Sequence, residues 1–81
     1  MRLDKYLKVS RLIKRRTVAN EACDGERIAV NGRPAKAGYQ VKIGDVIEIT
    51  FGNRTLKVEV TDVSENAKKA EASSMYRQIS S

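Results

Sequence analysis

The spacing of apolar residues along this chain changes once, near residue 25, and the change predicts two short helices followed by a small β-sheet. Before that point apolar side chains recur at helical spacing, with Leu3, Tyr6 and Leu7 one turn apart. After it, apolar and polar residues alternate, as in half-buried strands. The pattern therefore predicts an α+β domain in which two N-terminal helices pack on an antiparallel sheet.

The first helix is expected over residues 3–9 and the second over residues 17–24. Asp4 falls in the first turn of the first helix, where a carboxylate suits the positive end of the helix dipole. Thr17 is a candidate N-cap for the second helix, and Gly25 is a typical terminator. The small apolar side chains of the second helix would let a neighbouring element approach closely.

Turn residues divide the next segment into short extended pieces. Residues 27–30 are expected to form a strand that ends at Asn31-Gly32, a strong signal for a tight turn. Residues 33–36 are extended or looped, and Gly44-Asp45 indicates a second turn. We interpret both dipeptides, Asn31-Gly32 and Gly44-Asp45, as turn-forming residues and not as catalytic groups.

Two longer strands are expected over residues 46–51 and 56–61. In the first of them Ile47, Ile49 and Phe51 occupy alternate positions, so one face of this hairpin is apolar and should turn toward the helices. The other face of the hairpin is polar and should be exposed to solvent.

From residue 65 the sequence becomes polar and small. We therefore predict one small domain over residues 1–64 and a polar tail over residues 65–81 that is flexible or forms a marginal helix. Met75, Tyr76 and Ile79 are the tail residues that could dock back weakly on the domain.

Surplus positive charge is confined to the first 16 residues, here called the basic block. Its seven cations face one acid, Asp4, whereas residues 17–81 hold nine bases and nine acids, so the block alone accounts for the net charge of +6. The seven cations are Arg2, Lys5, Lys8, Arg11, Lys14, Arg15 and Arg16. The alternative is that the basic block is simply a solvent-exposed helix face with no ligand. However, seven cations with one neighbouring acid repel one another unless an anion binds. The block thus favours a surface for a polyanion.

Composition limits the chemistry that this surface can serve. The chain has no histidine and one cysteine, Cys23, so Cys/His zinc sites, internal disulfides and histidine-activated nucleophiles are excluded. Cys23 fits a small buried hydrophobe, and neither an enzyme nor a cofactor is indicated. No apolar run approaches the roughly 18–20 residues of a membrane span, and no signal-peptide pattern follows the basic start. We expect a cytoplasmic protein that does not bind membranes.

Among polyanions, RNA fits this pattern best. The second helix, with Val18, Ala19 and Ala22, is a poor recognition helix for the major groove of DNA. Arginine-rich surfaces suit RNA that is held by its shape and its phosphates. Tyr6 and Tyr39 could stack on bases, although core packing is the more usual role for such residues.

Several short motifs resemble a known RNA-binding family. They are Arg2-Leu3-Asp4-Lys5-Tyr6-Leu7, Arg11, Arg15-Arg16, Gly25, Ile28-Ala29-Val30-Asn31-Gly32 and Gly44-Asp45. Over residues 1–51 they resemble the S4-type RNA-binding domain, named for ribosomal small-subunit protein four and also called the αL motif. The order and spacing of the RLDxxL opening, the VNG turn and the later GD make the resemblance specific.

The resemblance also implies a function. S4-type domains are usually appended to larger enzymes such as pseudouridine synthases and tyrosyl-tRNA synthetases, whereas a chain this short is similar to the heat-shock protein fifteen group and, most closely, to the RqcP family of ribosome-quality-control factors. It implies binding to large-subunit rRNA and to peptidyl-tRNA on split, stalled ribosomes, in support of alanine tailing with a second factor that recruits alanyl-tRNA. The short C-terminal segment favours the quality-control branch, and we expect a monomer.

Carried over by position, the resemblance implies an RNA face on the two helices and a rim on the Asn31-Gly32 loop. The face would comprise Arg2, Asp4, Lys5, Lys8, Arg11, Lys14, Arg15 and Arg16, and the rim would comprise Arg33 and Lys36. Asp4 would orient the face. Two alternatives stay open: a heat-shock-type recycling factor, and a ribosome-assembly or regulatory module whose basic arm docks an acidic protein partner.

Overall fold

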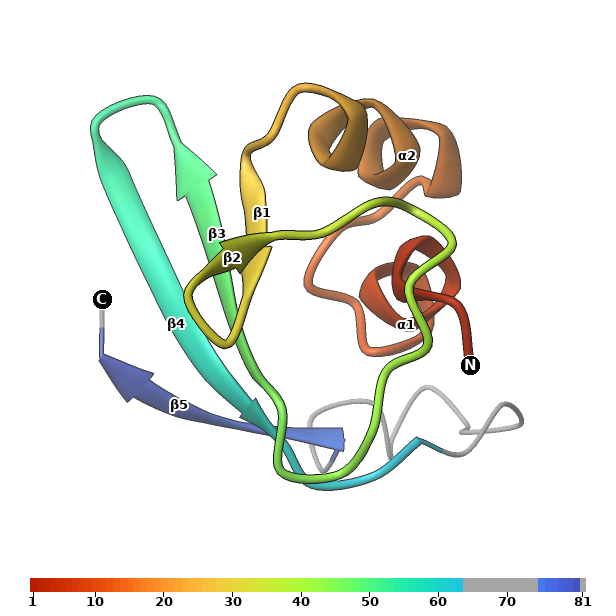
Figure 1. Cartoon of the computed structure of the whole chain (residues 1–81), viewed down its shortest axis with the longest axis vertical. Coiled ribbons are helices and arrows are strands. Elements are labelled where there is room, and N and C mark those ends of the chain that lie inside the picture. The colour runs from red at the N-terminus through yellow and green to blue at the C-terminus, as the bar shows by residue number, and fades with distance from the viewer. Residues whose placement is uncertain (64–74, 81) are drawn as a thin grey trace.

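The chain folds into two helices packed against one face of a five-stranded antiparallel sheet (Figure 1). The computed structural model describes residues 1–63 and 75–80. The elements are α1 (Leu3–Val9), α2 (Arg16–Asp24), β1 (Ile28–Val30), β2 (Arg33–Pro34), β3 (Val46–Phe51), β4 (Arg54–Val60) and β5 (Tyr76–Ser80). The strands are arranged in the order β2-β1-β3-β4-β5. The predicted α+β architecture is confirmed.

The core lies between α1 and the middle of the sheet. Leu3, Tyr6 and Leu7 have no exposed surface, and they meet inward-facing residues of β1, β3 and β4 such as Ile47 and Val58, which are paired in register. The helical spacing and the strand alternation thus identified the buried side chains correctly. Phe51 is the exception, because it is 48% exposed at the end of the β3–β4 hairpin, whose tip lies apart from both helices (Figure 1).

Both predicted glycine turns are present. Asn31 and Gly32 have φ angles of 54° and 84°, as the two central residues of a tight hairpin between β1 and β2 require. Gly44 has a φ of 96° in the turn before β3. Positive φ at both central positions favours Asn-Gly because Asn tolerates this region and Gly has no Cβ to clash.

The start of α2 differs from the prediction. The helix begins at Arg16, and its N-cap position is Arg15, which makes no side-chain capping bond. The carbonyl of Arg15 accepts the first helical hydrogen bond, from the Ala19 amide at 3.0 Å. Thr17 therefore lies inside the first turn, and its assignment as N-cap is wrong because extended backbone ends earlier than the side-chain pattern indicates.

The prediction of a flexible polar tail is wrong for residues 75–80. Met75 has no exposed surface, and the following residues form β5, which pairs with β4 through Val60 and Tyr76. The hydroxyl of Tyr6 donates to the Met75 carbonyl at 2.6 Å, and the Thr61 amide donates to the same oxygen at 2.9 Å. A buried tyrosine hydroxyl requires an acceptor, and the C-terminal segment supplies it. The rest of the predicted tail, residues 65–74 and 81, lies outside the described residues.

We predict that Met75→Ala lowers the free energy of unfolding by about 2–5 kcal/mol, because it leaves a cavity in a small core. Ile79→Ala, in the strand that follows Met75, is the matched control. Its side chain is 46% exposed, so the loss should be clearly smaller. Urea unfolding followed by far-UV circular dichroism measures both. Equal losses for the two variants would mean that Met75 does not hold the C-terminal segment in the core.

Candidate nucleic-acid interface

The buried carboxylate of Asp4 joins the two ends of the basic block. Asp4 is 2% exposed, and it accepts hydrogen bonds from the Nε atoms of Arg2, at 3.2 Å, and Arg16, at 3.4 Å. Arg2 immediately precedes α1 and Arg16 begins α2. The carboxylate therefore ties the starts of the two helices together and fixes the directions of both guanidinium groups, as the sequence led us to expect.

Two further donors complete the environment of this carboxylate. The backbone N–H of Lys5 donates to Oδ1 at 2.8 Å, and the side-chain Nδ2 of Asn20 donates to Oδ2 at 3.4 Å. Sequence reasoning did not single out Asn20. Its signal is the spacing from Arg16, since residues four apart on a helix share a face.

Opposing effects set the pKa of Asp4. Burial acts to raise it, but the hydrogen bonds from Arg2, Asn20, Arg16 and the Lys5 amide outweigh burial and hold the pKa of Asp4 below its usual value of 3.8. The carboxylate is therefore charged at neutral pH. One negative charge facing two guanidinium groups leaves a net positive charge at the surface.

The two arginines keep donors for a ligand. The side chains of Arg2 and Arg16 are 50% and 47% exposed. A guanidinium has five N–H donors in a planar fork, which suits bidentate contacts with phosphate. Asp4 engages Nε and Nη2 of Arg2 and Nε of Arg16, so the outer parts of both forks face solvent at fixed positions.

The last turn of α1, with Lys8, and the segment between the helices present the middle of the basic block. Lys8, Arg11, Lys14 and Arg15 are all exposed, and no ion pair involves them in the described parts of the chain, residues 1–63 and 75–80. Arg11 has a φ of 66°, and the Ile13 amide donates to the Leu7 carbonyl at 3.0 Å, so the loop wraps back on α1. Lys5, within α1, is half buried.

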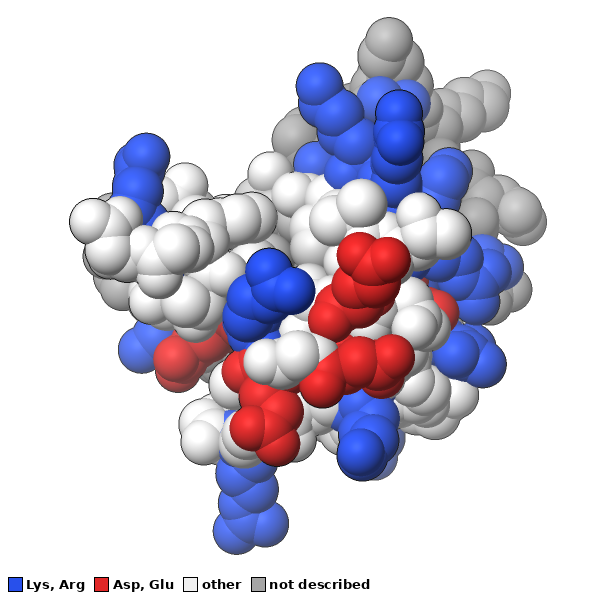
Figure 2. Space-filling model, turned by 90° about the horizontal axis from the view of Figure 1, so that it is seen from above, with Lys and Arg blue, Asp and Glu red and all other residues white. Residues whose placement is uncertain are grey.

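Acidic side chains form a group on one face of the molecule, with cations around them. Figure 2 shows this acidic group at the centre of the view, several Lys and Arg along the upper and right edges, and others at the left, near the centre and at the bottom. The exposed acids at and after the end of α2 are Glu21, Asp24 and Glu26. Glu21 lines a shallow hollow together with Arg16 and Asn20, so a polyanion would be attracted to the cations and repelled from the acidic part of α2 beside them.

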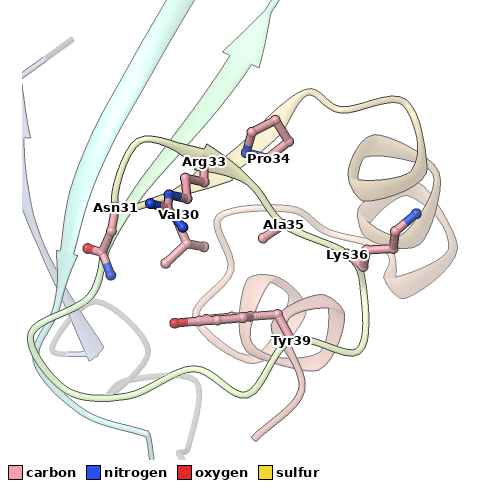
Figure 3. A pocket seen from close by; sticks show the side chains of 7 residues that line it. All are labelled: Val30, Asn31, Arg33, Pro34, Ala35, Lys36 and Tyr39. Carbon is pink, nitrogen blue, oxygen red and sulfur yellow. The ribbon is translucent and has the colours of Figure 1, made fainter.

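The predicted rim residues, Arg33 and Lys36, do not contact Asp4. They line a separate pocket together with Tyr39 (Figure 3). Backbone hydrogen bonds connect this region to the start of α1, because the Leu3 amide donates to the Tyr39 carbonyl at 2.8 Å and the Asp4 amide to the Ala37 carbonyl at 3.2 Å. The rim and the face thus belong to one continuous framework.

Cys23, metal sites and membrane-spanning helices are the other features to consider. Cys23 is 4% exposed, and burial raises the pKa of its thiol to about 11, so it is an unreactive core residue as expected. Within residues 1–63 and 75–80, no three His, Cys, Asp or Glu side chains are grouped so that they could hold a metal ion. Nor does any helix in this described part have the length and apolarity needed to cross a membrane.

We predict that Asp4→Asn destabilises the protein at neutral pH and that this loss shrinks in acid. The folded-state pKa of Asp4 is lowered, so its contribution is present above the unfolded value and disappears as pH falls through the folded one. Urea unfolding at pH 7, 5 and 3 measures the difference from the wild type. Asp24→Asn, at an exposed position of α2, is the control. A loss for Asp4→Asn that stayed constant across this range would contradict the ion-pair explanation.

The S4 domain family model matches residues 1–47. A curated relative, the RQC P-site tRNA stabilizing factor of Halalkalibacterium halodurans, is 59% identical over 76 residues, which cover 94% of this chain and 86% of the relative. The protein of the same name from Streptococcus pneumoniae is 55% identical over 80 residues, covering 99% and 91%.

Heat shock protein 15 is a more distant relative. Its homolog from Aeromonas salmonicida is 36% identical over 70 residues, which cover 86% of this chain and 53% of that protein. The trimeric structure of heat shock protein 15 from Vibrio cholerae superimposes with a TM-score of 0.89 at 31% identity, covering 98% of this chain and 81% of the other.

Proposed function

Since this chain belongs to the S4 domain family, we propose that it is a non-catalytic factor that binds large-subunit rRNA and the peptidyl-tRNA of split, stalled ribosomes. In this role it stabilises the tRNA in the P site during ribosome-associated quality control. The observation that carries the proposal is the Asp4 carboxylate. It holds Arg2 and Arg16 on one surface, where their outward-facing N–H groups can donate hydrogen bonds to phosphate.

The mechanism is one of position and charge. The exposed cations of the helices and of the loop between them contact phosphates, and the fixed arginine forks determine where the RNA backbone lies. No bond is made or broken. A tRNA held against rRNA in this way has fewer positions available, and its P-site position is favoured to the extent that the protein binds that arrangement better than others.

The quality-control branch is favoured over the heat-shock branch by the extent of similarity. The two relatives named RQC P-site tRNA stabilizing factor match over 86% and 91% of their own length, whereas the heat shock protein 15 homolog matches over 53% of its length. We accordingly propose that the protein acts in the cytoplasm, as a monomer, in support of alanine tailing with a second factor that recruits alanyl-tRNA. RNA contacts fall within residues 1–51, and β4 and β5 serve as scaffold.

We predict that Arg2→Ala and Arg16→Ala each abolish co-sedimentation with large ribosomal subunits while leaving the fold intact. Asp4 keeps the other arginine, Asn20 and the Lys5 amide as donors in each variant, so the carboxylate is not left bare. Arg54→Ala is the control, since this exposed arginine lies at the start of β4, outside the basic block. If both block variants sediment with large subunits like the wild type, the proposed face is wrong.

Salt dependence gives an independent measure of phosphate contacts. If six phosphates are neutralised, the logarithm of affinity should fall with the logarithm of salt concentration at a slope of roughly −4 to −5. Lys14→Ala should make the slope less steep by about 1. Titrations of labelled RNA by fluorescence anisotropy at several salt concentrations provide both values. A slope near zero would contradict electrostatic binding.

A further inference from the structure

The pocket beside the basic face has the composition of a nucleotide site. Its volume is about 670 Å³, within the range of roughly 300–1,000 Å³ that is typical of small-molecule sites. The residues that line it are Val30, Asn31, Arg33, Pro34, Ala35, Lys36 and Tyr39. They combine one aromatic ring, apolar walls, an amide and two cations, and no carboxylate is among these lining residues.

Hydrogen bonds at both ends of Tyr39 hold its ring in place in the pocket. The hydroxyl of Tyr39 donates to Oδ2 of Asp45 at 2.9 Å, its amide donates to the Lys36 carbonyl at 3.0 Å, and its carbonyl accepts from Leu3 at 2.8 Å. Figure 3 shows the ring along the floor of the pocket, with Val30 and Ala35 across from it. Because both ends of the residue are tethered, the ring needs little reordering to receive a ligand.

The other partners of Asp45 fix the opposite wall. Asn31 donates from Nδ2 to Oδ1 of Asp45 at 3.1 Å, and its Oδ1 accepts from the Val46 amide at 3.0 Å. Asp45 is 8% exposed, so one buried carboxylate positions both the tyrosine ring and the tight turn that precedes Arg33. Tyr39 packs against the core with part of its surface, and the rest of its side chain stays exposed and can meet a ligand.

The cations lie at the mouth of the pocket. Arg33 and Lys36 are exposed, and Figure 3 shows Arg33 above the apolar wall and Lys36 at the rim, with its amine directed toward α2. A base on the ring would leave its phosphate near Arg33, and the backbone would continue past Lys36 toward the helices. Unstacked bases of single-stranded RNA are commonly bound on aromatic rings in this way.

We propose that this pocket binds one unstacked RNA nucleotide, with its base on the face of Tyr39 and its phosphate at Arg33. The proposal rests on the proposed RNA-binding function and adds to it a contact with a base. The basic face holds backbone phosphates irrespective of sequence, whereas the pocket selects RNA that has a base free of its helix. The bound segment would therefore be a loop, a bulge or an end.

Two labelled RNA hexamers test the proposal, one with bases and one abasic with the same sugar-phosphate backbone. We expect the full-length protein to bind the hexamer with bases at least about 5-fold more tightly, because one stacked base contributes on that order or more. Tyr39→Leu should remove this preference and leave affinity for the abasic hexamer unchanged. Tyr39→Phe, which keeps the ring, should retain it. Arg33→Ala should weaken binding of both hexamers equally.

Tyrosine fluorescence provides a second measurement that does not require the leucine variant to fold. The chain has three tyrosines and no tryptophan, and a stacked base quenches tyrosine emission. Emission of the wild type should fall on binding the hexamer with bases but not the abasic one, and Tyr39→Phe should lack this fall. Equal wild-type affinity for the two hexamers, a folded Tyr39→Leu that keeps the preference, or quenching unaffected by Tyr39→Phe would each overturn the proposal.

The two proposals fail in different ways. If the pocket does not take a base, Arg2→Ala still abolishes association with large subunits. If instead the ribosomal function is wrong, the preference for bases persists in a protein that does not sediment with large subunits at all.

Discussion

The buried ion-pair cluster at Asp4 is the constraint on which the proposed RNA face depends. Burying the Asp4 carboxylate, which is 2% exposed, would be costly without hydrogen-bond donors around it. The buried position therefore requires donors such as Arg2 and Arg16 to be held beside it. The reverse also holds, because long arginine side chains lose their conformational freedom only when something fixes them. One acid thus converts two flexible cations into a rigid pair, and it does so across the junction of α1 and α2.

A second buried acid does the equivalent for the loops. Asp45 joins Tyr39, Asn31 and the Lys42 amide. Burial acts to raise its pKa, but the bond from the Lys42 amide and those from Asn31 and Tyr39 lower the pKa of Asp45 below the usual 3.8. The RLD opening and the GD pair of this sequence therefore have parallel roles, since each places one charged carboxylate where several chain segments meet. The carboxylates of these motifs hold the framework together, and the cations around them form the proposed contact surface.

Local patterns predicted the parts of the fold that local forces determine. Leu3, Tyr6 and Leu7 defined α1 by their spacing, Asn31-Gly32 defined the β1–β2 turn, and alternation defined β3. β5 was missed because Met75 and Ile79 are too sparse for a strand pattern. The burial of Met75 depends on the pairing of the next residues with β4 and on the hydroxyl of Tyr6. Such pairing is a long-range effect that no window of sequence contains.

The candidate site was predictable to the same extent and for the same reason. Charge counting identified the basic block, but Asn20 and Tyr39 acquire their roles only through contacts that the fold creates. Exposed cations with no carboxylate nearby repel one another, and a domain with so small a core has little stability with which to offset that repulsion. Such an arrangement is reasonable in a protein whose charged face is matched by an equally charged ligand. The exposed acids of α2, of which Glu21 lines a hollow together with Arg16, then limit how closely that ligand approaches this part of the helix.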